Sequence, residues 1–209
     1  MEAGIDALEV SLQPWQIQRL LSYLTLFEKW NRAYNLSAVR DASTMVYRHL
    51  LDSLSVLPYL AGAGDRFIDV GTGGGLPGIP LSIVFPEQKF TLLDSSGKKT
   101  RFLFQVGLEL GLENIAVENC RVESFKPTQL FDGVVSRAFA SLKDMTDNCH
   151  HLLAKGGRFW AMKGIYPRDE LSRLEKHYKV ESCHLLRVPG GGGERHLIEL
   201  RIGEPGSTG

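Results

Sequence analysis

Glycines follow one apolar stretch of the chain closely enough to suggest a ligand-binding turn. Residues 67–70 (Phe-Ile-Asp-Val) lead directly into Gly71, and Gly73, Gly75 and Gly78 then follow with GxGxxG spacing. Glycine lets a backbone turn sharply and approach a ligand, because it has no Cβ. This spacing is typical of dinucleotide-binding folds, but a glycine-rich turn also occurs where a helix packs tightly against a strand. The glycines alone therefore leave the ligand open.

Two carboxylates indicate which ligand this turn would hold. Asp69 lies inside the apolar stretch, where it can anchor the cationic amino group of a methionine moiety, directly or through water. The same carboxylate would repel the pyrophosphate of a dinucleotide. Asp94 ends the next apolar stretch, roughly 20 residues after Gly71, where it reaches the ribose hydroxyls of either ligand. Asp69 therefore favours S-adenosylmethionine, unless it is a buried carboxylate that only caps the turn.

An adenine would lie beside the end of the third predicted strand. Residues 121–123 (Arg-Val-Glu) occupy that place, and the backbone of Val122 and Glu123 is available for the edge of the base. Glu123 by itself is typical of a solvated turn, so only its location makes it a candidate. The predicted cofactor contacts therefore extend over three successive strand ends.

Basic residues follow the fourth and fifth predicted strands. Ligands in open α/β sheets bind outside the carboxyl ends of the strands. Arg137 and Lys163 are therefore candidates to face the transferable methyl group or its acceptor. The other interpretation of each is a surface charge beside a strand end. His150 and His151 lie in a predicted helix and are interpreted as helix surface.

The absence of two motifs limits the chemical classes of methyl acceptor that fit the sequence. It has no Pro-Cys pair, which would supply a nucleophilic cysteine for attack on a pyrimidine carbon. It also has no Asn-Pro-Pro-Tyr or Asp-Pro-Pro-Tyr motif, which is associated with exocyclic amino groups. An acceptor that needs no strong base fits this pattern. N7 of guanine is one, because its lone pair is free and no proton leaves on methylation, so catalysis would be mainly alignment.

The elements that must position these residues alternate between strands and helices. Short apolar runs predict strands at residues 67–70, 90–93, 115–117, 134–136, 159–162, 182–188 and 196–202. Helices are predicted near residues 80–85, 98–110, 144–153 and 168–177. Repeated βα units predict an α/β fold with a mostly parallel sheet and helices on both faces. The last two strands, joined by the loop 190–193, are predicted to be antiparallel, and the tail at 204–209 to be frayed.

Residues 1–60 are predicted to form a helical extension before the domain at residues 61–209. The first helix begins near Pro14, and its inward face is predicted from the spacing of Trp15, Leu20, Leu24 and Phe27. A second helix is predicted over residues 43–60, with an inward face formed by Met45, Leu50, Leu54 and Leu57.

The composition excludes several classes of protein. Of 209 residues, 43% are hydrophobic, so a sizeable core is available and disorder is not expected. The 24 basic and 24 acidic residues balance, so contact with nucleic acid would need a local basic patch. The three cysteines form no CxxC pair, which argues against a disulfide framework or a metal site. No apolar run could span a bilayer, so a cytoplasmic protein is expected.

Several segments together resemble one known family. They are the glycine-rich segment and residues 30–36 (Trp-Asn-Arg-Ala-Tyr-Asn-Leu), 48–53 (Arg-His-Leu-Leu-Asp-Ser), 92–95 (Leu-Leu-Asp-Ser) and 136–140 (Ser-Arg-Ala-Phe-Ala). This pattern resembles the ribosomal RNA small subunit methyltransferase G family, also called glucose-inhibited division protein B, from about residue 15 to residue 200. The resemblance implies a Rossmann-like class I S-adenosylmethionine-dependent methyltransferase fold with a seven-stranded sheet.

The resemblance also implies an activity and a set of contacts. The activity is methylation of a guanine N7 in bacterial 16S rRNA, with S-adenosylmethionine as donor and the small ribosomal subunit as partner. The family's cofactor contacts fall on Gly71, Leu76, Val122, Glu123 and Arg137. One departure is the glycine at position 74, where proline is common, and we expect it to loosen the turn without removing a contact.

Two hypotheses follow for the basic residues. A local basic surface for rRNA phosphates is predicted from Arg32, Arg40, Arg48, His49, Lys98, Lys99 and Arg101, although most single lysines are typical of solvated helix faces. Arg137 is the predicted catalytic residue. It would orient the cofactor or guanine O6 rather than N7, because the N7 lone pair must attack the methyl group.

The sequence therefore predicts an rRNA guanine-N7 methyltransferase that is a monomer and binds no metal. Two alternatives remain open from the residues alone. One is an NAD-dependent oxidoreductase that uses Gly73, Gly75 and Gly78. The other is a noncatalytic RNA-binding or ribosome-assembly factor that keeps the fold, although the intact set of Asp69, Gly71 and Asp94 argues against it.

Overall fold

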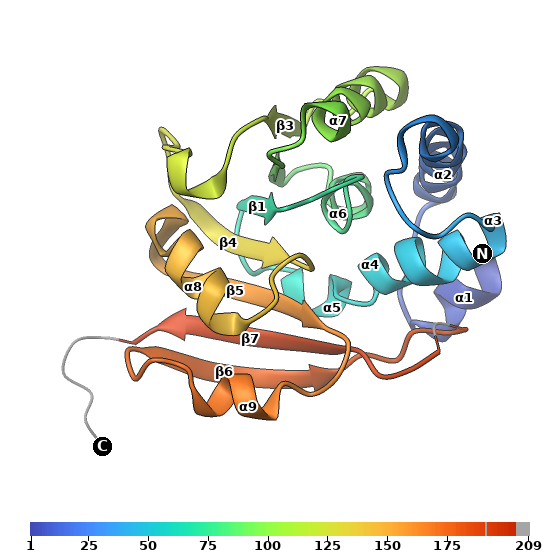
Figure 1. The fold of residues 1–209 in the computed structure, drawn as a ribbon. Helices are drawn as coiled ribbons and strands as arrows, with labels where there is room; N and C mark the ends of the chain where they lie inside the picture. The colour runs from blue at the N-terminus through green and yellow to red at the C-terminus, as the bar shows by residue number, and fades with distance from the viewer. Residues whose placement is uncertain (191, 204–209) are drawn as a thin grey trace.

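A computed structural model describes residues 1–190 and 192–203, and in it seven strands form one sheet. The sheet order is β3-β2-β1-β4-β5-β7-β6 (Figure 1). The strands are β1 (Arg66–Val70), β2 (Lys89–Leu93), β3 (Ile115–Glu118), β4 (Phe131–Ser136), β5 (Leu153–Lys163), β6 (Tyr178–Leu185) and β7 (His196–Ile202). Strands β1 to β5 are parallel, whereas β7 runs antiparallel to both β5 and β6. The predicted α/β fold with a mostly parallel sheet and an antiparallel final pair is confirmed.

Helices cover both faces of this sheet. The α-helices are α1 (Glu2–Ala7), α2 (Pro14–Tyr34), α3 (Ala42–Met45), α4 (Asp52–Leu54), α5 (Leu57–Leu60), α6 (Gly78–Val84), α7 (Gly97–Leu110), α8 (Leu142–Cys149) and α9 (Arg168–Ser172). Shorter helical segments are η1 (Val46–Leu51), η2 (Val122–Ser124) and η3 (His150–Leu152). Successive strand residues point to opposite faces. Trp160 of β5 therefore joins a core with α2 and α4 to α7, whereas Phe159 joins a second core with α8.

Helix α2 begins with recognisable signals, and the predicted inward residues Leu20 and Phe27 are buried, whereas Trp15 is not. Pro14 is its first residue, and the side chains of Gln13 and Gln16 form a reciprocal capping box. Its buried residues are Gln16, Leu20, Tyr23, Phe27 and Asn31. The prediction for Trp15 is wrong, since this side chain is 43% exposed. Gln16 is inward because its amide donates to the carbonyls at the end of α6.

The single helix predicted over residues 43–60 is also wrong. A π-helix, η1, lies between α3 and α4, and a turn at Ser55 and Val56 separates α4 from α5. Serine hydroxyls accompany this irregularity, because Ser53 Oγ donates to the His49 carbonyl and Ser55 Oγ to the Asp52 carbonyl. The predicted inward residues of this segment are all buried: Met45, Leu50, Leu54 and Leu57.

The observed bounds of helices and strands differ from the predicted bounds mainly near the C-terminus. The helix predicted at residues 168–177 ends at Ser172, and β6 begins at Tyr178. The helix predicted at 144–153 is α8 followed by η3, so β5 begins already at Leu153. The tail at 204–209 and one residue of the loop 190–193 lie outside the described residues. In the described ranges, no helix is long and apolar enough to cross a membrane.

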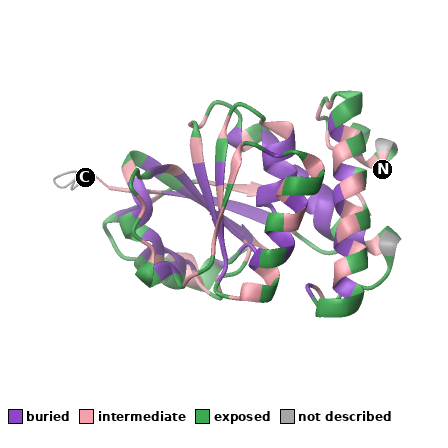
Figure 2. Cartoon of the chain, turned by 90° about the horizontal axis from the view of Figure 1, so that it is seen from above, coloured by how far each residue is buried: buried purple, intermediate pink, exposed green. Residues whose placement is uncertain are grey.

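One hydrophobic core joins the N-terminal helices to the sheet. Leu20, Phe27 and Leu54 belong to the same buried cluster as Phe67 of β1 and Ile79 of α6. Figure 2 shows this arrangement as buried strands at the centre with helices whose outer faces are exposed. The division into 1–60 and 61–209 stays a prediction, but α2 and α4 pack against α6, the helix that follows the glycine-rich turn, and α2 also packs against α7.

Candidate functional site

The glycine-rich turn lies where the strand order reverses, between β2 and β4 on either side of β1. Ligands of open α/β sheets bind at such a switch point, outside the carboxyl ends of the strands. The turn is tied to the neighbouring strand by backbone bonds. Gly71 N and Thr72 N both donate to the Leu93 carbonyl, at 2.8 and 3.1 Å. The turn after β1 therefore has a fixed position relative to the end of β2.

Asp94, directly after β2, connects the glycine-rich turn to the start of α7 through its carboxylate. Its Oδ2 accepts from Gly73 N at 2.9 Å, and its Oδ1 accepts from Ser96 N at 2.8 Å. Lys99 Nζ lies 3.4 Å from Oδ2. An ionised carboxylate has about four lone-pair positions, and donors already occupy three of them here. Oδ1 can therefore still accept one hydroxyl group of a ligand, and a second hydroxyl would replace Lys99 on Oδ2. The residue is 6% exposed and forms part of a cavity wall.

A cavity of about 290 Å³ opens beside Asp94 and is called the Asp94 cavity here. Val122 and Glu123 form part of its wall, as their position after the third strand predicts. Val122 is buried in the second core, whereas Glu123 is exposed. Gly71 and Ala138 close the cavity on the side of β1 and β4. Its lining brings together residues from the ends of four strands, β1 to β4.

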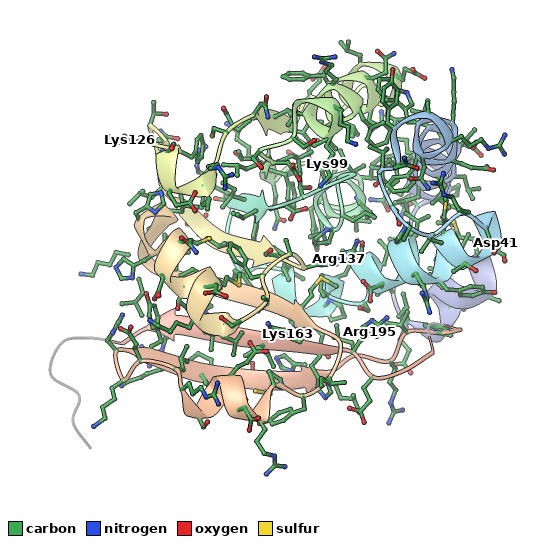
Figure 3. All side chains as sticks on the ribbon, in the orientation of Figure 1. Asp41, Lys99, Lys126, Arg137, Lys163 and Arg195 are labelled. Atoms are coloured by element: carbon green, nitrogen blue, oxygen red, sulfur yellow. The ribbon has the colours of Figure 1, made fainter. Side chains whose placement is uncertain are left out.

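A second cavity, of about 530 Å³, is called the Arg137 cavity. Its wall combines the end of β4 with the N-terminal helices and the loop before β7. Figure 3 shows Arg137, Lys163 and Arg195 around the carboxyl ends of β4 and β5, with Lys99 on the other side of Arg137. Gly73 and Leu76, both predicted cofactor contacts, also line the Arg137 cavity rather than the Asp94 cavity.

The two cavities meet at Gly71 and Ala138, which line both. A Cβ on Gly71 would lie 2.6 Å from the Cβ of Ala138, a distance too short for two carbon atoms. Gly71 also has φ +70, a conformation that L side chains rarely adopt. Glycine at this position keeps the junction open. The site therefore fits an elongated ligand with a ribose at one end and charged groups at the other, as S-adenosylmethionine has.

Asp69 lies beneath the turn and lines neither cavity. Its Oδ2 accepts from Thr72 Oγ1 at 2.7 Å and from Gly78 N at 2.8 Å. Its Oδ1 is buried and has no partner among the described residues. Burial raises the pKa of this carboxyl to about 6. These contacts are those of a carboxylate that caps the turn, and the predicted anchoring of a methionine amino group stays a prediction.

Two further glycines of the turn serve packing. A Cβ on Gly75 would lie 2.5 Å from Ile79, so glycine here lets α6 follow the turn closely. A Cβ on Gly74 would lie 2.2 Å from the ring of Phe27. The Gly74 carbonyl accepts from the Tyr23 hydroxyl at 2.6 Å. Glycine at position 74 thus allows α2 to pack on the turn.

Arg137 is paired rather than free. Its Nη1 donates to Asp52 Oδ2 at 2.9 Å and approaches the Arg48 carbonyl at 3.4 Å. Arg195 Nε donates to the other oxygen of Asp52 at 3.1 Å. Asp52 and Arg195 are not among the site residues that the sequence predicts. Asp52 does lie in the segment 48–53 that carries the family resemblance, whereas no pattern around Arg195 pointed to the site.

Lys163 supports the loop after β4 and lines the Arg137 cavity. Its Nζ forms an ion pair with Glu170 at 2.8 Å and donates to the carbonyls of Phe139 and Ala140. The side chain is only 11% exposed. These contacts fix the loop that follows Arg137, and a direct role toward the acceptor stays a prediction.

In the structure, some residues of the predicted basic surface are exposed and others line the two cavities. Arg32, Arg40, Arg48, Lys98 and Arg101 are exposed. His49 is buried in the wall of the Arg137 cavity, where burial lowers its pKa, so its assignment to a cationic surface is wrong. Lys99 lies at the Asp94 cavity. The sequence grouped these residues because basic residues cluster there in a neutral chain, and clustering along the chain does not show which side chains are buried.

Comparison with protein families agrees with this geometry. A family model described as rRNA small subunit methyltransferase G matches residues 16–198. The chain belongs to this family. The match to the methyltransferase G family confirms the resemblance found in the sequence. It also confirms the enzyme class and S-adenosylmethionine as cofactor.

Similar proteins of the same family cover nearly the whole chain. A ribosomal RNA small subunit methyltransferase G of Saccharophagus degradans is 58% identical over 202 residues, which are 97% of this chain and 90% of that protein. One of Cellvibrio japonicus is 60% identical over 193 residues, 91% of this chain and 88% of that protein. This family member therefore spans most of the length of its relatives.

Solved structures with low sequence identity share the fold. A mutant of MtNAS in complex with S-adenosylmethionine has a TM-score of 0.58 at 16% identity, covering 87% of this chain and 75% of that one. TrmN from Thermus thermophilus has a TM-score of 0.57 at 18% identity, covering 75% of this chain and 53% of that one. These similarities agree with the predicted class I methyltransferase fold of the methyltransferase G family.

Proposed function

We propose that this chain transfers a methyl group from S-adenosylmethionine to N7 of a guanine in 16S rRNA of the small ribosomal subunit. The observation that carries the proposal is the junction at Gly71 and Ala138, the two residues that line both the Asp94 cavity and the Arg137 cavity. Membership of the methyltransferase G family supports the rRNA substrate. The guanine acceptor rests on the resemblance and on the chemistry of the site.

The residues of the Asp94 cavity would hold the nucleoside part of the cofactor. The Asp94 carboxylate would accept the ribose hydroxyls, and each such charge-assisted bond contributes about 1.5–3 kcal/mol. The backbone of Val122 and Glu123 would face the adenine edge. S-adenosylmethionine supplies the electrophilic methyl group when it is bound. Gly71 would leave room for the chain that connects the two cavities.

The acceptor would enter the Arg137 cavity. Methylation at N7 releases no proton, so the site needs no general base and acts mainly by alignment. The one carboxylate in the described lining, Asp52, is engaged by two guanidinium groups, which suits it to positioning rather than to proton transfer. Arg137 would orient the cofactor or guanine O6 and leave N7 uncovered.

The test is transfer of labelled methyl from S-adenosylmethionine to small-subunit particles that lack their own modifications. We expect the label as 7-methylguanosine in the rRNA, identified by mass spectrometry of the nucleosides. A chain that binds S-adenosylmethionine but labels neither naked 16S rRNA nor particles would refute the substrate assignment. Label in a different nucleoside would refute guanine N7 alone.

The family match decides between the functions that the sequence left open. It supports rRNA methylation over an NAD-dependent oxidoreductase and over a noncatalytic assembly factor. We further propose that the enzyme acts in the cytoplasm as a monomer, without a metal ion, on the assembled small subunit. Sedimentation of the protein with and without small-subunit particles would test both the monomeric state and the partner.

A further inference from the structure

We propose that Asp52 is a positioning residue that holds Arg137 and Arg195 together as a clamp for one anionic group in the Arg137 cavity. The three residues come from distant parts of the chain: Asp52 begins α4, Arg137 follows β4, and Arg195 precedes β7. The proposal rests on the proposed function, because it assigns the clamp to the substrates of that reaction.

The carboxylate of Asp52 uses one oxygen for each arginine. Oδ2 accepts from Arg137 Nη1 at 2.9 Å, and Oδ1 accepts from Arg195 Nε at 3.1 Å. The Asp52 side chain is 7% exposed, whereas those of Arg137 and Arg195 are 27% and 29% exposed. The carboxylate is therefore buried behind two guanidinium groups that still reach the cavity.

Charge in the cavity wall favours an anion. The described residues that line it include four cations, Arg48, Arg137, Lys163 and Arg195, but only one carboxylate, Asp52. The positive charge of Lys163 is balanced by its ion pair with Glu170, which lies outside the cavity lining. One carboxylate shared by two arginines leaves a positive charge, and a partly buried charge is costly unless it is paired. An anionic ligand would supply the missing partner.

Donor groups also remain for such a ligand. A guanidinium has five N–H donors in a planar fork that matches carboxylate and phosphate oxygens. Arg195 uses Nε toward Asp52 and Nη1 toward the Glu194 carbonyl, and its Nη2 has no partner among the described residues. The bond from Nε to Asp52 restricts the fork to one orientation. Asp52 thereby pre-orders the donors before a ligand arrives, which lowers the entropic cost of binding.

Asp52 lies at the end of an irregular helical segment that lines the Arg137 cavity. The π-helix η1 ends directly before it, and Asp52 N donates to the Tyr47 carbonyl in the wider turn. Single π-turns inside helices occur frequently at functional sites. Arg48, His49 and Asp52 of this segment all line the Arg137 cavity. The helix irregularity that the sequence did not predict therefore belongs to the part of the chain that carries the clamp.

The chemistry that the clamp recognises is an oxyanion. The reaction offers two sources, namely the methionine carboxylate of the cofactor and a phosphate of the target nucleotide. Two probes separate them. S-adenosylhomocysteine carries the carboxylate, and 5′-methylthioadenosine has the same nucleoside without the amino-acid part. Small-subunit particles that lack methylation carry the phosphates.

The experiment compares Arg195→Met and Asp52→Asn with wild type and with Arg187→Met. Arg187 is an exposed arginine before the same loop and lies outside the Arg137 cavity, so it is the matched control. Affinities for the three probes are measured by calorimetry or filter binding. Loss of one charge-assisted contact should weaken binding about 10-fold to 100-fold.

The pattern of loss identifies the anion. Weaker binding of S-adenosylhomocysteine with unchanged binding of 5′-methylthioadenosine supports clamping of the cofactor carboxylate. Unchanged affinity for both nucleosides with weaker binding of particles supports clamping of a phosphate. If all three affinities of Arg195→Met equal those of Arg187→Met, the clamp is refuted.

A double variant separates positioning from independent binding. If Asp52 acts only by positioning the two arginines, Asp52→Asn should cause no further loss of affinity in a variant that already lacks both, Arg137→Met combined with Arg195→Met. Additive losses would overturn the positioning role, and Asp52→Glu should restore part of the affinity if that role is correct. These binding measurements need no turnover. Failure of wild-type methyl transfer to rRNA would therefore refute the proposed function separately from the clamp.

Discussion

The two cavities of the site are built in different ways. The Asp94 cavity is lined by loops that follow β1, β2, β3 and β4, all between residues 70 and 139. The Arg137 cavity needs the helical segment at Asp52, the end of β4 and the loop at Arg195, which are brought together only by tertiary packing. Thus the Asp94 cavity comes from one repeated βα pattern, whereas the Arg137 cavity is assembled from both ends of the chain.

This difference explains where function can be varied. The Asp94 cavity is held by short bonds from the backbone of Gly73 and Ser96 to Asp94, so its wall is fixed before a ligand binds. The Arg137 cavity depends on ion pairs between separate segments, which can be exchanged without rebuilding the sheet. We therefore expect changes in the first cavity to affect cofactor affinity, and changes in the second to affect the charged ends of the substrates.

The largest effect is expected from Gly71→Ala, which places a methyl group at the junction between the two cavities. The added Cβ would meet that of Ala138 at 2.6 Å in a backbone with φ +70. We expect affinity for S-adenosylhomocysteine to fall on the order of 100-fold, the scale of forced overpacking. Calorimetric titration measures this affinity.

Two further variants show whether the junction is the cause. Gly111→Ala has φ +59 but nothing within 4 Å, so it should cost about 1–2 kcal/mol of stability and leave cofactor affinity unchanged. Adding Ala138→Gly to Gly71→Ala should restore part of the affinity. If the double variant binds as weakly as the single one, a steric block at the junction is not the cause.

Asp94→Asn tests the cofactor side alone. An amide has one oxygen in place of two and cannot keep both backbone bonds and two ribose hydroxyls, so affinity for 5′-methylthioadenosine should fall about 10-fold to 100-fold. Asp132→Asn is the matched control. Asp132 also accepts from two backbone N–H groups, those of Asp65 and Arg66, but at the amino ends of the strands. Equal losses in both variants would remove Asp94 from the ribose site.

The pH dependence of stability tests the turn beneath both cavities. Burial raises the pKa of Asp69 to about 6, whereas its pKa in an unfolded chain is about 3.9. The folded state then binds more protons between these values, so Asp69 makes stability fall as the pH rises from about 4 to about 6. Relative to Asp69→Asn, wild type should lose about 2 kcal/mol over this range.

Urea unfolding of both proteins at several pH values measures this difference. Above about pH 7 the two curves should run parallel, because Asp69 is then ionised in both states. Parallel curves over the entire range from about pH 4 to about pH 8 would mean that the carboxyl is not held in its buried form.

The smallest effect is expected from Tyr23→Phe. This variant tests whether α2 contributes to cofactor binding. The variant leaves the Gly74 carbonyl without its buried donor and should cost about 1–2 kcal/mol of stability. Tyr34→Phe, at a 45% exposed residue of the same helix, should cost almost nothing. Thermal unfolding measures both. A loss of cofactor affinity as large as in Asp94→Asn would show that α2 is part of the cofactor site.

The same contrast between local and assembled structure explains what the sequence could predict. Gly71, Asp94 and Val122 follow strands whose apolar pattern is visible, and parallel strands bring their ends together. The helix break at Ser55 and Val56 is accompanied by a hydrogen bond from the Ser55 hydroxyl to the Asp52 carbonyl, which no periodicity reveals. The pairing of Asp52 with Arg195 joins residues 143 positions apart, so the segment around Asp52 could point to the family but not to this partner.

The most direct test of the account is a crystal structure of the chain with S-adenosylhomocysteine. We expect the ribose at Asp94 and the adenine beside Val122, with the amino-acid part passing Gly71 into the Arg137 cavity. A nucleoside placed in the Arg137 cavity, or a ligand that leaves Gly71 and Ala138 untouched, would contradict the claim that the two cavities form one cofactor site.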